Sequence, residues 1–323
     1  MKKIIITGCA GFIGSNLAEK LIKTKNFVFG IDSFHPYYKR SIKEFNISQL
    51  NKNRNFQFLE SDIRKIDKSV FKNKQFDICI HLASTPGVLS SINDEESYYE
   101  NNVNGTINLL KNLALINTKK LIFASSSTVY KDEKNSFFDE NKTPTKPLSP
   151  YGKTKLRCEE LIKEWSSREL SSFVNLRFFS VYGPCIRPDL AIYKFTNRIN
   201  NNIPLSIYGD GQSQRDYTHI DDIINGILLT VNYISKRKNI SATFNIGNGN
   251  PIRLIDLIKI IEKKLNKSAI IEYLPFNDIE MYRTCASLKL VSEKLNYQPT
   301  INIENGIDNF IEWYKKNHIL YNY

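Results

Sequence analysis

The first half of the chain alternates short apolar runs with helical patterns, and this alternation limits the fold more than any other feature. Six apolar runs are typical of strands, at residues 4–7, 27–31, 56–59, 78–82, 121–124 and 174–179. Amphipathic patterns at residues 15–25, 98–116 and 151–169 predict helices between them. Strands that alternate with helices pair in parallel through right-handed crossovers. Because several runs are apolar throughout, we expect helices on both faces of the sheet.

The alternation weakens after about residue 180, where turn clusters such as Tyr-Gly-Asp-Gly at 208–211 separate shorter elements. The length of 323 residues agrees with two domains, at roughly 150 residues for each. We therefore expect a first domain over residues 1–180, with its sheet completed by part of 216–248. A smaller, interleaved α/β domain over residues 181–323 would bind most of the substrate.

Charge and composition exclude several classes of protein. The net charge of +12 is spread along the chain without a basic block, which argues against a nucleic-acid partner and is compatible with an anionic substrate. The bias toward Lys is also typical of an AT-rich genome. No apolar run approaches the roughly 20 residues of a membrane-spanning helix. The apolar stretch at the start of the sequence breaks at Gly8 and continues as a helical pattern, which argues against a signal peptide.

The cysteines and histidines predict neither disulfides nor a metal site. The five cysteines are odd in number, lie far apart and contain no CxxC pair, which fits a reducing cytoplasm better than a disulfide scaffold. The four histidines show no spacing typical of metal ligands.

A glycine-rich turn follows the first predicted strand and precedes the first predicted helix. Gly8, Gly11 and Gly14 have the spacing GxxGxxG, with Phe12 and Ile13 inside it. Glycines at such a turn let the backbone approach a pyrophosphate, and the helix start supplies free N–H groups and positive dipole. The chain is therefore expected to have a Rossmann-type, doubly wound parallel sheet that binds a dinucleotide.

Acidic residues follow the next two strands. Asp32 ends the second strand, 18 residues after Gly14. A carboxylate there accepts hydrogen bonds from the adenosine ribose and repels a 2′-phosphate, which favours NAD over NADP. Asp62 and Ile63 follow the third strand, where we expect them to contact the adenine.

A tyrosine and a lysine four residues apart begin the helix at 151–169. Tyr151 and Lys155 share one helix face, and an ammonium beside a phenol lowers the pKa of the phenol from about 10. The phenolate is then a usable general base for a hydroxyl. A second pair with this spacing, Tyr130 and Lys134, runs into a polar loop, so we expect no catalytic role for it.

Four hydroxyl residues, Ser125-Ser126-Ser127-Thr128, follow the strand at 121–124. Ligands of open α/β sheets bind beyond the carboxyl ends of the strands. A cluster of hydroxyls at this place can orient a substrate hydroxyl and share its proton.

These motifs together resemble the extended short-chain dehydrogenase/reductase superfamily, and within it the nucleotide-sugar epimerases. The segments that carry the resemblance appear in family order: TGCAGFIG, HLAS at 81–84, SSSTVY at 125–130, SPYGKTK at 149–155, LRFFSVYGP at 176–184 and QRDYTHIDD at 214–222. The resemblance implies that Ser126 is the catalytic hydroxyl, Tyr151 the base and Lys155 its partner. It also implies that Leu82 and Ala83 line the NAD site and that Arg215 binds the diphosphate.

Two longer blocks, at 31–44 and 183–196, are similar to UDP-glucuronate 4-epimerases. That similarity implies that Ser127, Thr128 and Ser180 line the sugar near C5 and that Arg187 lies near the nucleotide. Asp189 is expected to be a loop residue.

Three residues differ from the family's pattern. Lys131 replaces the usual Gly, Leu89 stands where these epimerases usually carry Arg, and Ser287 replaces the usual Asp. Leu89 removes a cation from near the expected sugar site.

The resemblance implies an NAD-dependent 4-epimerase that interconverts UDP-glucuronate and UDP-galacturonate through a 4-keto sugar. An epimerase of UDP-glucose or its N-acetyl form is the nearest alternative. A decarboxylase or a 4,6-dehydratase would need acidic residues where Ser127 and Thr128 stand, and a non-catalytic NAD-binding sensor usually lacks the Tyr or the Lys. The resemblance further implies a cytoplasmic homodimer in polysaccharide biosynthesis.

Overall fold

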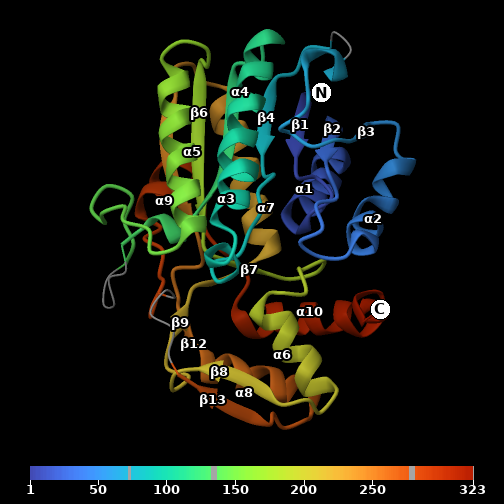
Figure 1. The fold of residues 1–323 in the computed structure, drawn as a ribbon, viewed down its shortest axis with the longest axis vertical. Helices are drawn as coiled ribbons and strands as arrows, with labels where there is room; N and C mark the ends of the chain where they lie inside the picture. Colours follow the sequence, from blue (N-terminus) through green and yellow to red (C-terminus); the bar gives the residue numbers. More distant parts are fainter. Residues whose placement is uncertain (72–73, 132–136, 276–280, 323) are drawn as a thin grey trace.

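A sheet of seven parallel strands forms the centre of the computed structural model, which describes residues 1–71, 74–131, 137–275 and 281–322 (Figure 1). The strands lie in the order β11-β6-β5-β4-β1-β2-β3. Their bounds are Lys3–Thr7 for β1, Phe27–Asp32 for β2, Phe56–Glu60 for β3, Ile78–His81 for β4, Lys120–Ser126 for β5, Ser172–Phe178 for β6 and Ser241–Ile246 for β11. The predicted parallel sheet is confirmed, and each of the six expected strands lies within two residues of its expected bounds.

Helices cover both faces of this sheet, as the apolar strands predict. Helices α1 (Phe12–Lys23) and α7 (Ile220–Ser235) pack on one face, and α4 (Gly105–Leu115) and α5 (Pro150–Ser166) on the other (Figure 1). Alternate residues of each strand therefore enter different cores: Ile4 and Ile6 lie in one, whereas Ile5 lies in the other. Helix α2 (Arg40–Ser48) follows β2.

The direction of winding reverses between β1 and β4. The chain runs outward from β1 through β2 to β3, returns to β4 on the other side of β1, and continues through β5 to β6. The crevice between β1 and β4, at their carboxyl ends, is the place where open α/β sheets bind ligands.

The expected single helix at 98–116 is divided in the structure. It begins as α3 (Glu95–Tyr98), widens into a π-helical segment, η4 (Tyr99–Asn104), and continues as α4. The side chain of Asn102 exchanges two hydrogen bonds with the backbone of Thr85 and donates a third to Thr154. These contacts hold Asn102 inward at the widened turn, a tertiary constraint that helical periodicity does not reveal.

Most of the later elements gather beyond the carboxyl ends of the sheet (Figure 1). Three small sheets pair β7 (Ser180–Tyr182) with β10 (Tyr217–His219), β9 (Gln214–Arg215) with β12 (Ile252–Arg253), and β8 (Leu205–Tyr208) with β13 (Ile271–Leu274). The remaining helices are α6 (Ala191–Asn200), α8 (Leu254–Leu265), α9 (Lys289–Leu295), α10 (Ile303–Asn317) and α11 (Ile319–Asn322), with short 3-10 turns η1 (Leu50–Lys52), η2 (Lys68–Phe71), η3 (Ser90–Ile92) and η5 (Ser127–Val129). Within the described residues, the helices are too short or too polar to cross a membrane.

Candidate active site

A cavity of about 680 Å³ opens at the carboxyl ends of the strands, between the sheet and the later elements. Every residue that the sequence singled out for the site lines it. These residues are Gly8, Gly11, Phe12, Ile13, Gly14, Asp32, Asp62, Ile63, Leu82, Ala83, Ser126, Ser127, Thr128, Tyr151, Lys155, Ser180, Arg187 and Arg215. The structure therefore brings together segments that are more than 200 residues apart.

The glycine turn forms one end of the cavity. A Cβ on Gly14 would stand 2.2 Å from the carbonyl oxygen of Gly8, so only glycine lets α1 start this close to β1. Gly8 itself has a φ of 71°. No side chain caps the N–H groups at the start of α1, and Phe12 and Ile13 of its first turn line the cavity beside the positive end of the helix dipole. These groups fit the pyrophosphate of a dinucleotide.

Asp32 lies beside this turn, at the end of β2. Its buried carboxylate accepts hydrogen bonds from the backbone N–H groups of Ala10 and Phe34, at 3.1 and 2.8 Å. Burial raises the pKa of Asp32, while the nearby ammonium of Lys43 acts in the opposite direction. The carboxylate faces the cavity, where it could accept hydrogen bonds from ribose hydroxyls.

Two residues near Asp32 were not predicted. Lys43 lies 4.6 Å from the ring centre of Tyr38 and donates a hydrogen bond to the carbonyl of His35. Among the described residues, the buried hydroxyl of Tyr38 has no partner, and it lies 3.9 Å from where a Cβ of Gly11 would stand. A donor aimed at the phosphate end of the cavity is a further fit to a dinucleotide. Both side chains belong to the block at 31–44, which is similar to UDP-glucuronate 4-epimerases. That similarity did not suggest a role for either residue.

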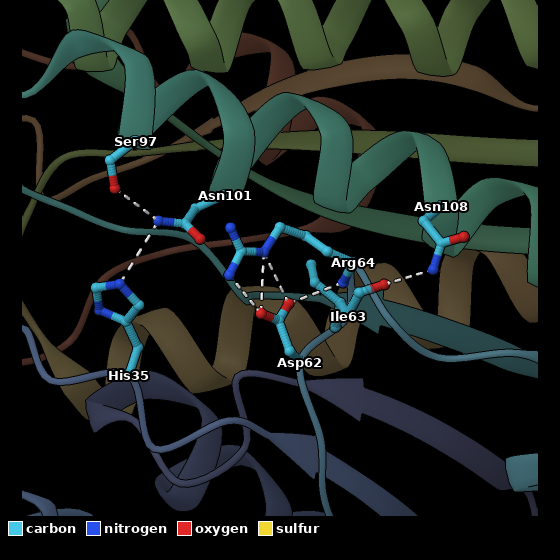
Figure 2. A network of polar contacts seen from close by, with 7 residues as sticks. All are labelled: His35, Asp62, Ile63, Arg64, Ser97, Asn101 and Asn108. Carbon is cyan, nitrogen blue, oxygen red and sulfur yellow. Dashed lines mark hydrogen bonds and ion pairs between the residues drawn. The ribbon is translucent and has the colours of Figure 1, made fainter.

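A polar network fixes the loop after β3, at the expected adenine end (Figure 2). The Nε of Arg64 donates to both carboxylate oxygens of Asp62, and its Nη2 donates to Oδ2. Although partial burial opposes ionisation, these hydrogen bonds lower the pKa of Asp62. The carbonyl of Ile63 accepts a hydrogen bond from Asn108 at 2.7 Å. The loop is therefore tied to α4. If Asp62 contacts the adenine, its carboxylate does so while it also accepts hydrogen bonds from Arg64.

The start of α5 positions the proposed catalytic pair. The hydroxyl of Ser149 caps the helix by accepting the N–H of Gly152, and Pro150 occupies the first turn. A Cβ on Gly152 would stand 2.5 Å from the carbonyl oxygen of Thr128, so glycine permits the close contact of α5 with the hydroxyl cluster. The Nζ of Lys155 then lies 5.8 Å from the ring centre of Tyr151.

The pKa of Tyr151 differs from the expected one. Desolvation raises it to about 12, and this effect exceeds the lowering by the charge of Arg187 and by a hydrogen bond with Ser126. Burial also lowers the pKa of Lys155 to about 8. The prediction that Lys155 lowers the pKa of Tyr151 below its ordinary value is therefore wrong for this arrangement, because both groups are desolvated together.

Ser126 has a defined hydrogen-bonding direction. Its oxygen accepts bonds from the backbone N–H and the hydroxyl of Thr128, at 3.2 and 3.0 Å. Because both lone pairs are occupied, its own proton remains available to donate. The groups in reach are Tyr151 and any oxygen bound beside it.

The expected sugar end of the cavity contains both hydroxyls and a charged pair. Arg187 binds the carboxylate of Asp189 through two nitrogens, each at 2.9 Å, and the hydroxyl of Tyr37 donates to the same carboxylate. Burial opposes the charge, but Asp189 raises the pKa of Arg187. Asp189 is therefore the counter-ion of Arg187, and not merely the loop residue that we expected.

Arg215 is carried by the short strand β9. Its Nη1 donates to the carbonyls of Gln214 and Tyr282, which places a cation at the cavity wall. Leu89 also lines the cavity, just before η3. Lys131 is exposed and lies outside the cavity lining, as does Ser287, whose N–H donates to Phe138.

Tyr130, the tyrosine of the second Tyr–Lys spacing, lies outside the cavity lining. Tyr130 is fully buried, and its hydroxyl donates to Asn245 at 2.7 Å. Lys134 lies outside the described residues. Tyr130 therefore has a structural partner in the sheet, and it does not line the cavity.

Comparisons with known proteins agree with this geometry. The family model of the NAD dependent epimerase/dehydratase family matches residues 4–247. A UDP-glucuronate 4-epimerase of Thermodesulfobacterium geofontis is 34% identical, over 97% of this chain and 96% of the relative. A crystal structure of a Bacillus cereus UDP-glucuronic acid 4-epimerase, in complex with UDP-glucuronic acid and NAD, is 36% identical with a TM-score of 0.91 and covers 97% of this chain and 99% of that one. The UDP-glucose 4-epimerase of Thermotoga maritima, with UDP-glucose, is 27% identical with a TM-score of 0.87 and covers 98% and 99%.

Proposed function

The chain belongs to the NAD dependent epimerase/dehydratase family, and from this membership we propose that it interconverts UDP-glucuronate and UDP-galacturonate. The observation that carries the proposal is the end of β5, where residues 125–128 line the same cavity as Tyr151 with four hydroxyls and no carboxylate. The glycine turn, Asp32 and the Tyr38 hydroxyl fit NAD at the other end.

Tyr151, Ser126 and Lys155 each have a separate role in the proton transfer. The phenolate of Tyr151 accepts the proton of the C4 hydroxyl, and the free proton of Ser126 donates to that oxygen as charge develops on it. Lys155 supplies the positive charge beside the phenol. When bound, NAD supplies the acceptor of the C4 hydride and then its donor, so the net reaction is redox-neutral.

The sugar must present both faces of C4 while its nucleotide stays bound. Arg215 lines the same cavity as Tyr151, and its guanidinium would hold the diphosphate while the sugar rotates. A 4-keto-uronate is a β-keto acid and loses CO₂ readily. Ser127, Thr128 and Ser180 offer fixed, neutral hydrogen bonds that could keep the carboxylate from aligning for cleavage.

The same hydroxyls argue against neighbouring reactions. Elimination by a 4,6-dehydratase and decarboxylation both call for an acidic side chain where Ser127 or Thr128 stands. A non-catalytic NAD sensor is disfavoured because Tyr151 and Lys155 are both present and both line the cavity.

One observation favours a second candidate, a 4-epimerase of UDP-glucose or UDP-N-acetylglucosamine. Leu89 lines the cavity where uronate epimerases usually carry Arg, so one cation that could attract a carboxylate is missing. Arg187 is a cation in the same cavity, but Asp189 neutralises it.

The test is to incubate the purified protein separately with UDP-glucuronate, UDP-glucose and UDP-N-acetylglucosamine and to follow the products by proton NMR. We expect UDP-galacturonate from the first. UDP-xylose, a 4-keto-6-deoxy product, or turnover of the neutral sugars alone would contradict the proposal. Tyr151→Phe should abolish turnover while NAD remains bound, and it serves as the control for contaminating activity.

Further properties belong to the same proposal. We assign residues 1–180, with part of 216–248, to NAD binding and residues 181–323 mainly to the UDP-sugar. The five cysteines are free, which supports a reducing cytoplasm. A homodimer through the faces of α4 and α5, and a role in polysaccharide biosynthesis, complete the assignment.

A further inference from the structure

Helix α5 presents three residues, four apart, to three consecutive residues of β5. Lys155 donates to the carbonyl of Ala124 at 2.8 Å. One turn before it, Tyr151 faces Ser126, and one turn after it Glu159 accepts the hydroxyl proton of Ser125. The catalytic pair and Glu159 therefore form one row on α5 that contacts residues 124–126 of the strand.

Glu159 is the end of this row that is fixed to the sheet by charge. Arg177, on β6, binds its two carboxylate oxygens at 3.0 and 2.7 Å, and both side chains are under 10% exposed. Burial opposes the charge of Arg177, but the bond to Glu159 raises its pKa, so the guanidinium stays charged. A bidentate pair of this kind fixes orientation as well as distance.

Arg177 is itself held from both neighbouring strands. In the register of the sheet it lies opposite Ser125 on β5 and opposite Asn245 on β11. Its guanidinium carbon lies 4.6 Å from the ring centre of Tyr130, whose hydroxyl donates to Asn245. The tyrosine that the sequence marked as a non-catalytic copy thus forms part of the support for this cation.

We propose that the Glu159–Arg177 ion pair is the positioning element of the catalytic site, holding α5 in register with β5. Neither residue lines the cavity, so the pair acts through Lys155 and Ser125 and not on the substrate. The pair positions the catalytic residues whatever the substrate is, and only the activity assay that tests this role rests on the proposed function.

The carboxylate of Glu159 also favours the charged form of Lys155. The titratable groups that face Lys155 are Tyr151, Cys158 and Glu159 on α5 and His81 on β4. After desolvation, which lowers the pKa of Lys155, Cys158 and Glu159 are the groups that raise it. Removing the charge of Glu159 would also leave Arg177 as an unpaired cation nearby, and both changes act against the ammonium.

The decisive variant is Glu159→Gln, compared with Glu160→Gln. Glu160 is the next residue on α5, half-exposed and paired with Arg157 on the surface. We expect Glu159→Gln to lower kcat about three- to tenfold at pH 9, to lower it less at pH 6 and to leave KM for the sugar nucleotide unchanged. The weakened pair loosens α5 on β5 at both pH values, and at pH 9 the loss of the carboxylate also disfavours the ammonium of Lys155. Glu160→Gln should match the wild type at both pH values.

A second variant guards against simple loss of folding. In Glu159→Leu/Arg177→Met the pair is replaced by apolar side chains of similar size, which commonly restores stability. We expect a thermal unfolding midpoint near that of the wild type, with kcat still at least about fivefold lower. Wild-type kcat in this double variant, or wild-type kcat in Glu159→Gln at both pH values, would overturn the proposal.

Failure of the positioning role can be distinguished from failure of the proposed substrate. The assay uses whichever UDP-sugar the wild-type protein epimerises, so a different substrate changes the assay and leaves the comparison between variants intact. The inference fails only if the variants behave as the controls do.

Discussion

The proposed catalytic chemistry depends on two side chains that are desolvated together. Tyr151 needs to be a phenolate while Lys155 remains an ammonium, yet the pKa of the phenol is raised to about 12 and that of the amine is lowered to about 8. The pair thus keeps two protons below about pH 8 and one proton above it, and the reactive arrangement is one of the two forms of the singly protonated pair.

This order of protonation predicts the pH dependence of the reaction. Because the pair must first lose one proton, kcat should rise about tenfold per unit up to about pH 8 and then level off. The measurement is kcat under saturating substrate from about pH 6 to pH 10. A kcat that already falls between pH 6 and pH 8 would show that another group limits the reaction.

For single residues, the sequence predicts which side chains form the site better than it predicts their burial and their pKa values. Ser126, Tyr151 and Lys155 could be found because their spacing and order along the chain are local signals. The raised pKa of Tyr151 could not, since it depends on burial by side chains from several elements. The pairing of Arg187 with Asp189 depends likewise on how one loop folds back.

At the scale of elements, a chain of hydrogen bonds joins β1, β4 and α4 beneath the cavity. Thr7 accepts the N–H of Ala83, and Thr106 donates to the carbonyl of Asn102. His81 lies between the two hydroxyls, with Nδ1 2.7 Å from Thr7 and Nε2 2.9 Å from Thr106. The directions of the outer bonds assign the proton to Nε2 and leave Nδ1 to accept from Thr7.

This buried imidazole predicts a loss of stability in acid. Burial lowers the pKa of His81 from 6.5 to about 3, so its contribution is complete above about pH 6.5 and is lost as the pH falls toward 3. Each pH unit below 6.5 costs about 1.4 kcal/mol of the free energy of unfolding. At pH 5, about one and a half units lower, the loss is about 2 kcal/mol. Urea unfolding of the wild type and of His81→Gln at pH 7 and pH 5 measures it.

The comparison isolates the histidine because every other titrating group is common to both proteins. His81→Gln should be less stable at pH 7, yet its free energy of unfolding should fall by about 2 kcal/mol less between the two pH values. An equal fall in both proteins would mean that His81 does not titrate in the folded state as described.

Elements were predictable from the sequence where their causes are local. The strands could be read from apolar runs, and the start of α1 from three glycines within seven residues. The π-helical turn at 99–104 could not, because Asn102 is held by Thr85 and Thr154, 17 and 52 residues away. The Glu159–Arg177 pair was missed for the same reason, since it depends on strand register.

At the scale of the molecule, the proposed dimer can be tested directly. If the faces of α4 and α5 form the interface, sedimentation should give about twice the chain mass of 37.4 kDa. Tyr99 lies next to α4 and is 47% exposed, so Tyr99→Arg should shift the protein toward the monomer. A wild-type protein that sediments as a single chain at micromolar concentration would exclude the dimer.

In the proposed reaction, hydrogen leaves C4 of a UDP-uronate and returns to the opposite face of the same carbon. The most direct measurement is proton NMR of the product formed in ordinary water from UDP-glucuronate that carries deuterium at C4. We expect UDP-galacturonate in which C4 retains the deuterium. UDP-galacturonate with hydrogen from solvent at C4, or a product without the carboxylate, would contradict it.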